Sequence, residues 1–248
     1  MRMIIHPDYA YMRNFIEQLP VLFDKTGKLL HDGRNKVKLF KVNQESIIVK
    51  RYKVPYIFQR IAYTFFRPSK AERAYLYAHL FRERGFNTPH EIAYIRINHY
   101  GLFKDSFFVS TVTTDLPLLS ALKQRPINKQ LINELANYLV RLHQNGILHG
   151  DLNLTNILYQ KEDKSYEFSL IDINRSKFIE SPSFSTCMKD LNRLTHDKEL
   201  LQFIVSQYAI IRGWNKKHCI EQVMKQLSLL EKHRQQKYRI RKILKMKL

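Results

Sequence analysis

The sequence predicts an α+β protein of two lobes, in which a small β-rich lobe with one long helix precedes a larger helical lobe. Three observations lead to this prediction. Residues 25–54 alternate strand-like runs with turn residues, residues 68–85 carry a helical repeat, and the chain after about residue 115 is mostly helical. We place the boundary near residues 112–116, which gives domains of 1–114 and 115–248.

The first lobe begins with a short helix expected at 8–18, followed by strands that Gly27, "DG" and "NQE" interrupt. The helix at 68–85 has Pro68 and Ser69 at its start, small and aromatic residues at helical spacing, and Gly85 at its end. The runs "EIAYIRI" and "DSFFVSTVT" are rich in β-branched and aromatic residues, which favours two further strands.

The second lobe begins with an amphipathic helix at 128–146, which Gly146 ends. The polar loop "ILHGDLNLTNILYQ" follows, and then the strand "EFSLIDIN" at 167–174, which ends in polar residues. From about residue 183 the chain is mostly helical.

The composition describes a folded protein with an anionic partner. Of its 248 residues 44% are hydrophobic and 26% charged, and the formal net charge is +20. Nucleic acid, an acidic membrane surface or a phosphorylated substrate could supply the negative charge. We expect no nucleic acid, because the chain lacks interleaved aromatic and basic residues of the RNP type.

The compartment we expect is the cytosol. Two cysteines, Cys187 and Cys219, are too few for a disulfide framework. The first residues, "MRMIIHPDYAYMRN", lack the apolar core of a signal peptide, and no apolar run of about 18 residues could span a bilayer.

The polar loop carries the residues for phosphoryl transfer. Asp151 and Asn156 stand five apart, as in the kinase pattern H-R-D-x-x-x-x-N, and Asp172 follows at a strand end, in "DIN". Asp151 would orient and deprotonate the attacking hydroxyl, and Asn156 and Asp172 would bind Mg²⁺. Lys50, in the strand "SIIVK", would hold the phosphates of ATP, with Ile48 on the same face against the adenine.

These motifs resemble the protein-kinase-like fold, and most closely the bacterial lipopolysaccharide core kinases, the Kdo and heptose kinase family. The loop "HGDLNLTNIL" has Asn153 two residues after the catalytic Asp, as that family does. "GRN" at 33–35, "RPSKAER" at 67–73 and "GFNTPHEIAYI" at 85–95 are similar to its small lobe, and the resemblance spans roughly residues 25–195.

The resemblance implies transfer of the γ-phosphoryl group of ATP to a sugar hydroxyl of a lipopolysaccharide-type glycolipid. It implies that Gly33 lies over the nucleotide and that the adenine contacts the connector at 108–113. His149 would support the catalytic loop. Asp190 is either the acid that anchors this loop or an ordinary acid on a helix surface, and the sequence leaves both open.

Two features depart from the kinase pattern. Only Gly33 is available for a loop over the phosphates, and it could equally be a plain turn glycine. Ala74 stands where the helix of the small lobe usually provides a glutamate to the lysine, and Glu72 lies about 200° away around the helix.

The C-terminal segment has a basic face and an opposing apolar stripe. The basic residues are Arg234, Lys237, Arg241 and Lys245. Such a helix either lies on an anionic membrane or packs on the large lobe. The first alternative places the protein peripherally at the inner face of the cytoplasmic membrane.

Three rival interpretations remain. A compact RIO-like protein kinase would share the same motifs. A pseudokinase that only binds its ligand would fit the sparse glycines and the missing glutamate. Asp151 and Asn156 could also form an ordinary turn, with their side chains bonded to the backbone.

Overall fold

The computed structural model describes residues 1–123, 126, 128–163 and 165–245, with side chains up to residue 240. The chain forms two compact units. The first is Met1–Thr114 with Ser169–Arg175, and the second is Asp115–Phe168 with Ser176–Leu248. The chain passes from the first unit to the second after Thr114. The segment around Asp172, which the sequence assigned to the second lobe, packs with the first unit instead.

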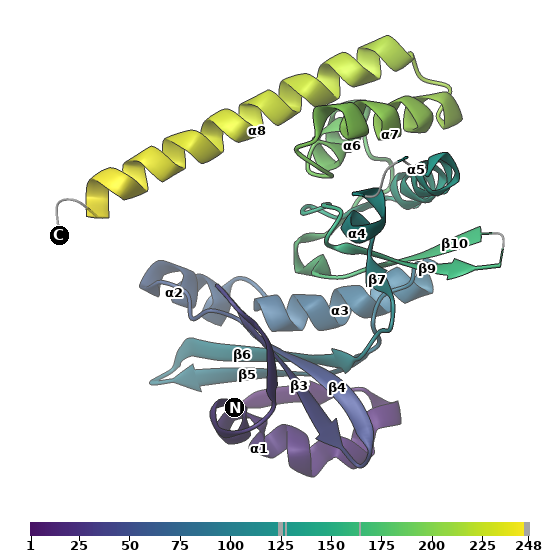
Figure 1. The fold of residues 1–248 in the computed structure, drawn as a ribbon. Helices are drawn as coiled ribbons and strands as arrows, with labels where there is room; N and C mark the ends of the chain where they lie inside the picture. The colour runs from purple at the N-terminus through teal and green to yellow at the C-terminus, as the bar shows by residue number, and fades with distance from the viewer. Residues whose placement is uncertain (124–125, 127, 164, 246–248) are drawn as a thin grey trace. The chain divides into compact units, whose positions relative to one another are not determined.

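The first unit is built on a six-stranded sheet in the order β1-β5-β6-β4-β3-β2 (Figure 1). Every neighbouring pair of strands is antiparallel. The strands are β1 (Arg2–Ile5), β2 (Lys28–Asp32), β3 (Lys36–Val42), β4 (Glu45–Arg51), β5 (Glu91–His99) and β6 (Leu102–Thr111). Hairpins join β2 to β3, β3 to β4 and β5 to β6. Because β4 pairs with β3 on one side and β6 on the other, it lies inside the sheet.

One face of this sheet is covered by α1 (Arg13–Lys25), which follows the 3-10 helix η1 (Pro7–Met12). The helix expected at 8–18 therefore starts later and continues past Pro20. Ile16, Leu19 and Phe23 repeat at helical spacing and pack on inward-facing strand residues such as Val49.

The opposite face carries α3 (Lys70–Glu83). Ser69 caps its first turn by accepting a hydrogen bond from the Glu72 amide, and Gly85 has φ +75° just beyond its end. The helix predicted at 68–85 is thus confirmed, with the cap and the stop that the sequence indicates.

A further helix, α2 (Ile57–Phe65), lies before α3 and was not predicted. It packs on β6. Most of its large apolar side chains are exposed, whereas Tyr63 is buried.

The second unit is mainly helical. Its helices are α4 (Leu118–Leu122), α5 (Lys129–Gln144), α6 (Phe184–Leu191), α7 (Lys198–Ile211) and α8 (Lys216–Lys245). Its short strands are β7 (Leu116–Pro117), β8 (Ile147–Leu148), β9 (Ile157–Glu162), β10 (Ser165–Leu170) and β11 (Lys177–Phe178), and the end of β10 from Ser169 belongs to the first unit. The mixed α+β composition with a helical second part agrees with the expected fold class.

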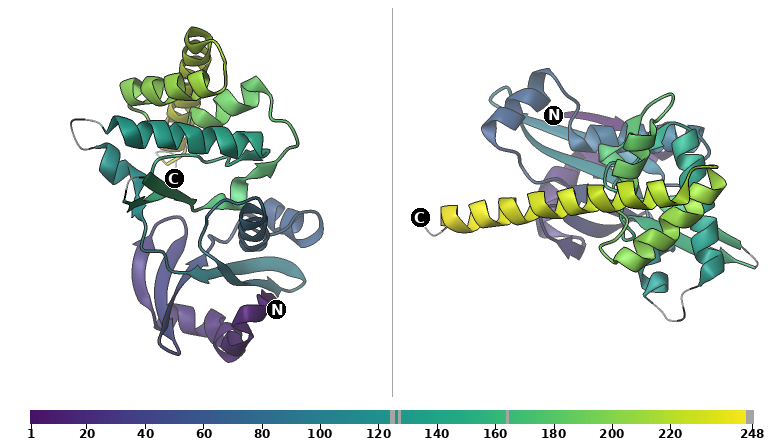
Figure 2. Two further views of the ribbon diagram at one scale, coloured as in Figure 1. Left: turned by 90° about the vertical axis from the view of Figure 1, so that its right-hand side faces the viewer. Right: turned by 90° about the horizontal axis from the view of Figure 1, so that it is seen from above.

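Figure 2 shows α8 as one long continuous helix. Cys219, Val223 and Leu227 are buried, whereas residues 232–240 are exposed. The side chains of Arg241 and Lys245 lie outside the described residues. Within the described part of the chain, no helix is long and apolar enough to cross a membrane.

Candidate active site

Lys50 lies on β4 and forms an ion pair with Asp172. Its Nζ atom is 2.8 Å from Asp172 Oδ1, and the side chains are 18% and 32% exposed. Alternation along β4 buries Ile47 and Val49 against α1, so Ile48 and Lys50 face the other side of the sheet. The expected lysine therefore sits beside the carboxylate expected to bind metal.

Asp172 reaches this position because the segment Ser169–Arg175 joins the first unit. Leu170 N donates to Asn87 O at 2.9 Å, and Thr88 Oγ1 donates to Leu170 O at 2.7 Å. Asp172 then adopts φ +60°, a left-handed conformation that is uncommon for residues other than glycine. Asn174 Nδ2 donates to Asp172 Oδ1 at 2.6 Å, which fixes the direction of the carboxylate.

Lys50 does not use a helix glutamate. Ala74 is 3% exposed in α3, and the hydroxyl of Tyr94 donates to Glu72 Oε1 at 3.4 Å. Among the residues that the structure describes, the acid that pairs with Lys50 is Asp172. The departure noted in the sequence is therefore real, and the ammonium is positioned by a different carboxylate.

Several cations of the first unit lie near Lys70, which also interacts electrostatically with Asp172. Burial lowers the pKa of Lys70, and three neighbouring guanidinium groups lower it further, those of Arg34, Arg175 and Arg73. Arg34 directly follows Gly33 in the turn between β2 and β3. Arg73 is 7% exposed, and among the described residues its Nε has no hydrogen-bond partner. This concentration of positive charge suits a ligand with several phosphates.

The loop with Asp151 is anchored by Asp190 within the second unit. The Asp190 carboxylate accepts hydrogen bonds from the amides of His149 and Gly150, both at 2.8 Å. Gly150 has φ +76°, so a side chain at this position would be strained. These contacts are the ones that an anchoring role for Asp190 requires.

His149 supports the loop through its own ring. The residue is fully buried, and its Nδ1 accepts a hydrogen bond from the Asp151 amide at 3.3 Å. Its carbonyl oxygen accepts from Ser176 Oγ at 3.3 Å. A buried imidazole that accepts from the backbone is placed to hold the loop rather than to take a substrate proton.

The side chains of Asn153 and Asn156 stabilise the C-terminal part of the loop through hydrogen bonds to its backbone. Asn153 Oδ1 accepts from the backbone amides of Thr155 and Asn156. Asn156 Nδ2 donates to Asp151 O at 2.9 Å, which leaves an amide oxygen, the atom type that Mg²⁺ prefers. Asp151 itself is 3.4 Å from Arg193 Nη1. Arg193 was not among the residues predicted from the sequence, although it lies only three residues after Asp190.

A buried ion pair lies behind the loop. His143 Nε2 is 3.5 Å from Asp190 Oδ2, and both side chains are almost completely buried. Burial disfavours the charged imidazolium, but the Asp190 carboxylate outweighs it and raises the pKa of His143 to about 9. The same pairing lowers the pKa of Asp190 in spite of its burial. Asp190 is therefore held ionised, as an acceptor of two amide hydrogen bonds must be.

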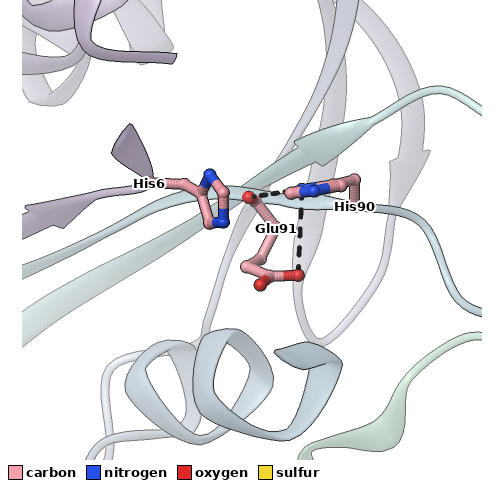
Figure 3. A group of neighbouring side chains, drawn as sticks. All are labelled: His6, His90 and Glu91. Atoms are coloured by element: carbon pink, nitrogen blue, oxygen red, sulfur yellow. Dashed lines mark hydrogen bonds and ion pairs between the residues drawn. The ribbon is translucent and has the colours of Figure 1, made fainter. Parts of the chain in front are cut away.

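A second group of polar residues, His6, His90 and Glu91, lies at the edge of the sheet in the first unit (Figure 3). Their ligand-type atoms lie within 4.8 Å of one another. Glu91 is fully buried, and Arg82 Nη2 donates to its Oε1 at 2.5 Å. Because this guanidinium already supplies a cation, we interpret the group as a buried ion pair that ties α3 to β5.

Comparisons with known proteins agree with this geometry. The model of the lipopolysaccharide kinase (Kdo/WaaP) family matches residues 56–213. The 3-deoxy-D-manno-octulosonic acid kinase of Vibrio cholerae is 23% identical over 180 residues, which cover 69% of this chain and 73% of that protein.

Two solved structures have a similar fold. The structure titled WaaP in complex with acyl carrier protein matches with a TM-score of 0.62 and 15% identity, over 95% of this chain and 99% of that one. The Rio2 kinase of Chaetomium thermophilum, in its ADP complex, matches with a TM-score of 0.50 and 14% identity, over 94% of this chain and 78% of that one. These likenesses confirm the expected protein-kinase-like fold.

Proposed function

Because the chain belongs to the lipopolysaccharide kinase (Kdo/WaaP) family, as the resemblance indicated, we propose that it transfers the γ-phosphoryl group of ATP to a sugar hydroxyl of a lipopolysaccharide-type glycolipid. The observation that carries this proposal is the loop with Asp151, which Asp190 anchors through two amides and which ends at Asn156. Such a loop presents a carboxylate for the attacking hydroxyl.

In this mechanism Asp151 accepts the proton of the sugar hydroxyl and orients its oxygen toward the γ-phosphorus. Arg193 contacts the Asp151 carboxylate and keeps it directed. Lys50 binds phosphate oxygens, and Arg34, Lys70 and Arg73 add positive charge on the same unit. The barrier falls because these groups are already positioned where negative charge must be stabilised.

The donor atoms are of the kind that magnesium takes. Asp172 in the first unit offers a carboxylate, and Asn156 in the second unit offers an amide oxygen, both of which are hard ligands. When bound, the ion would neutralise charge on the phosphates. Lys50 then serves a second purpose, because its ion pair holds the Asp172 carboxylate in place.

The nucleotide base would lie on the sheet face of Lys50. Ile48 is on that face and half-buried, and Phe108 pairs with Lys50 across β4 and β6. The connector that follows β6 at 112–114 offers backbone groups for the adenine edge. Gly33 and its turn would cover the phosphates.

The acceptor would be anionic, with the protein at the inner surface of the cytoplasmic membrane. The net charge of +20 supports an acceptor that bears phosphates or carboxylates. The exposed cations of α8, including Arg234 and Lys237, would contribute to attraction toward anionic lipid.

The test uses purified protein with Mg²⁺ and γ-labelled ATP. The acceptors are lipopolysaccharide precursors with one or two acidic sugars and, in a separate reaction, a mixture of cellular proteins. We expect label in the glycolipid and a phosphate-sized mass increase by mass spectrometry. Label in protein alone would favour a protein kinase, and no ATP turnover with any acceptor would favour a binding module.

A further inference from the structure

Residues 54–66, which include α2, expose an unusual number of apolar side chains. Phe58 and Phe66 are each 83% exposed, and Phe65 is 68% exposed. The complete set, here called the α2 patch, is Val54, Tyr56, Ile57, Phe58, Ile61, Phe65 and Phe66. Isolated exposed apolar residues are common on proteins, but here Ile57, Phe58, Ile61 and Phe65 share one face of the helix by their spacing. The Phe65 and Phe66 rings lie 6.3 Å apart, and a group of this kind indicates a binding surface.

The direction of this helix is fixed by polar contacts on its other side. Arg60 Nε donates to Phe103 O at 2.7 Å, and Thr64 Oγ1 accepts from Phe103 N at 2.8 Å. The Tyr63 and Phe103 rings lie 5.3 Å apart. A surface helix normally turns its apolar side to the core, whereas α2 is bound to β6 by Arg60 and Thr64 and turns its phenylalanines to solvent.

Charge complementarity identifies the partner. Between Tyr52 and Ala71 the chain has no acidic residue and four basic ones, Lys53, Arg60, Arg67 and Lys70. A second copy docked symmetrically on this patch would bring the same cations together, which is unfavourable. An anionic lipid surface satisfies both features, because it offers apolar chains to the rings and phosphates to the cations.

We propose that the α2 patch inserts into the headgroup region of an anionic bilayer. Phe58, Phe65 and Phe66 enter the acyl boundary, while Lys53 and Arg67 contact lipid phosphates. The inference rests on the proposed function in one respect, since an acceptor anchored in a bilayer requires an enzyme at its surface. It assigns the contact to α2, whereas the sequence had pointed only to the C-terminal helix.

The test measures binding of the full chain to vesicles of phosphatidylethanolamine and phosphatidylglycerol by flotation, without ATP or acceptor. The variant with Phe58→Gln, Phe65→Gln and Phe66→Gln should keep its fold, because all three side chains are exposed. We expect its partitioning to fall roughly a hundred-fold. Lys53→Gln with Arg67→Gln should lower it roughly ten-fold and weaken its salt dependence.

The matched control removes exposed apolar side chains from α8 by Tyr238→Gln with Ile240→Gln, at positions that are 70% and 56% exposed. This control should bind vesicles like the wild type. If it loses binding while the triple phenylalanine variant retains it, α8 is the anchor and the proposal is wrong. The proposal would also be wrong if the wild-type protein does not bind vesicles and instead uses the α2 patch to dimerise or to bind an acyl carrier protein.

Vesicle binding and catalysis can fail separately. Asp151→Asn should bind vesicles normally while losing turnover. The triple phenylalanine variant should phosphorylate a soluble, short-chain acceptor at the wild-type rate and lose activity only on vesicle-embedded acceptor. Equal loss on both acceptors would mean that the patch supports the fold rather than the membrane contact.

Discussion

The Asp151 loop and the Lys50 region follow the kinase pattern to different extents. The loop keeps the whole polar arrangement, from His149 through Asn156, and Asp190 anchors it. The Lys50 region keeps the lysine but not the helix glutamate, because α3 has Ala74 at that position and Lys50 pairs with Asp172.

This difference shows which geometry is hard to replace. The loop must hold one carboxylate at a defined position. Several hydrogen bonds from backbone amides fix that position together, so the loss of any one of them would displace the carboxylate. A lysine ammonium needs only an acceptor within reach, and a carboxylate from another part of the chain can supply it. The following predictions test this contrast, beginning with the largest effect.

Asp151→Asn should have the largest effect on turnover. The amide cannot accept the hydroxyl proton, so we expect kcat to fall by about 10³-fold while ATP binding is retained. Single-turnover kinetics and isothermal titration calorimetry with ATP measure the two quantities. A kcat within a few-fold of the wild type would show that another group is the base.

The Lys50–Asp172 pair should behave as one unit. We expect Lys50→Met and Asp172→Asn each to lower kcat/KM for MgATP by about a hundred-fold, because each removes a charged group proposed to act on the phosphates or the metal and breaks the ion pair. The double variant should have a kcat/KM only slightly below that of the less active single variant.

Lys25→Met provides the control for this experiment, since Lys25 is an exposed lysine at the end of α1. It should change kcat/KM little. Strictly additive losses in Lys50→Met and Asp172→Asn would indicate that the two residues act independently.

The His143–Asp190 pair behind the loop should make stability depend on pH. The pKa of His143 is raised from 6.5 to about 9, so the pair stabilises the fold fully below about pH 6.5. That contribution, on the order of 3 kcal/mol, should be lost as the pH rises through about 9. Urea unfolding between these pH values measures it, and His143→Gln should remove this part of the pH dependence.

Restoring the usual glutamate should have the smallest effect on turnover. Because Asp172 already positions Lys50, Ala74→Glu should not raise kcat. It should lower the free energy of unfolding by about 1–3 kcal/mol, since position 74 is buried. Ala74→Gln, which has the same shape without the charge, is the control. A higher kcat in the glutamate variant than in the glutamine variant would contradict our interpretation of the pair.

The sequence predicted the elements in which periodicity and end signals agree. The helix at 68–85 and the strand with Lys50 had both. The first helix was placed too early, because residues 7–12 form the 3-10 helix η1 and α1 begins only at Arg13. The helix α2 was not predicted, although Ile57, Ile61 and Phe65 recur at helical spacing; in the structure these side chains are exposed and Tyr63 is buried.

The spacing of the polar loop could be read directly from the chain. Asp151, Asn156 and the glycine between His149 and Asp151 are local features, and local backbone geometry follows from them. Which distant groups meet depends on the tertiary fold. Asp172 reaches Lys50 from 122 residues away, because hydrogen bonds to Asn87 and Thr88 draw its segment into the first unit. The direction of the α2 patch was decided in the same way, by contacts to β6 that no periodicity encodes.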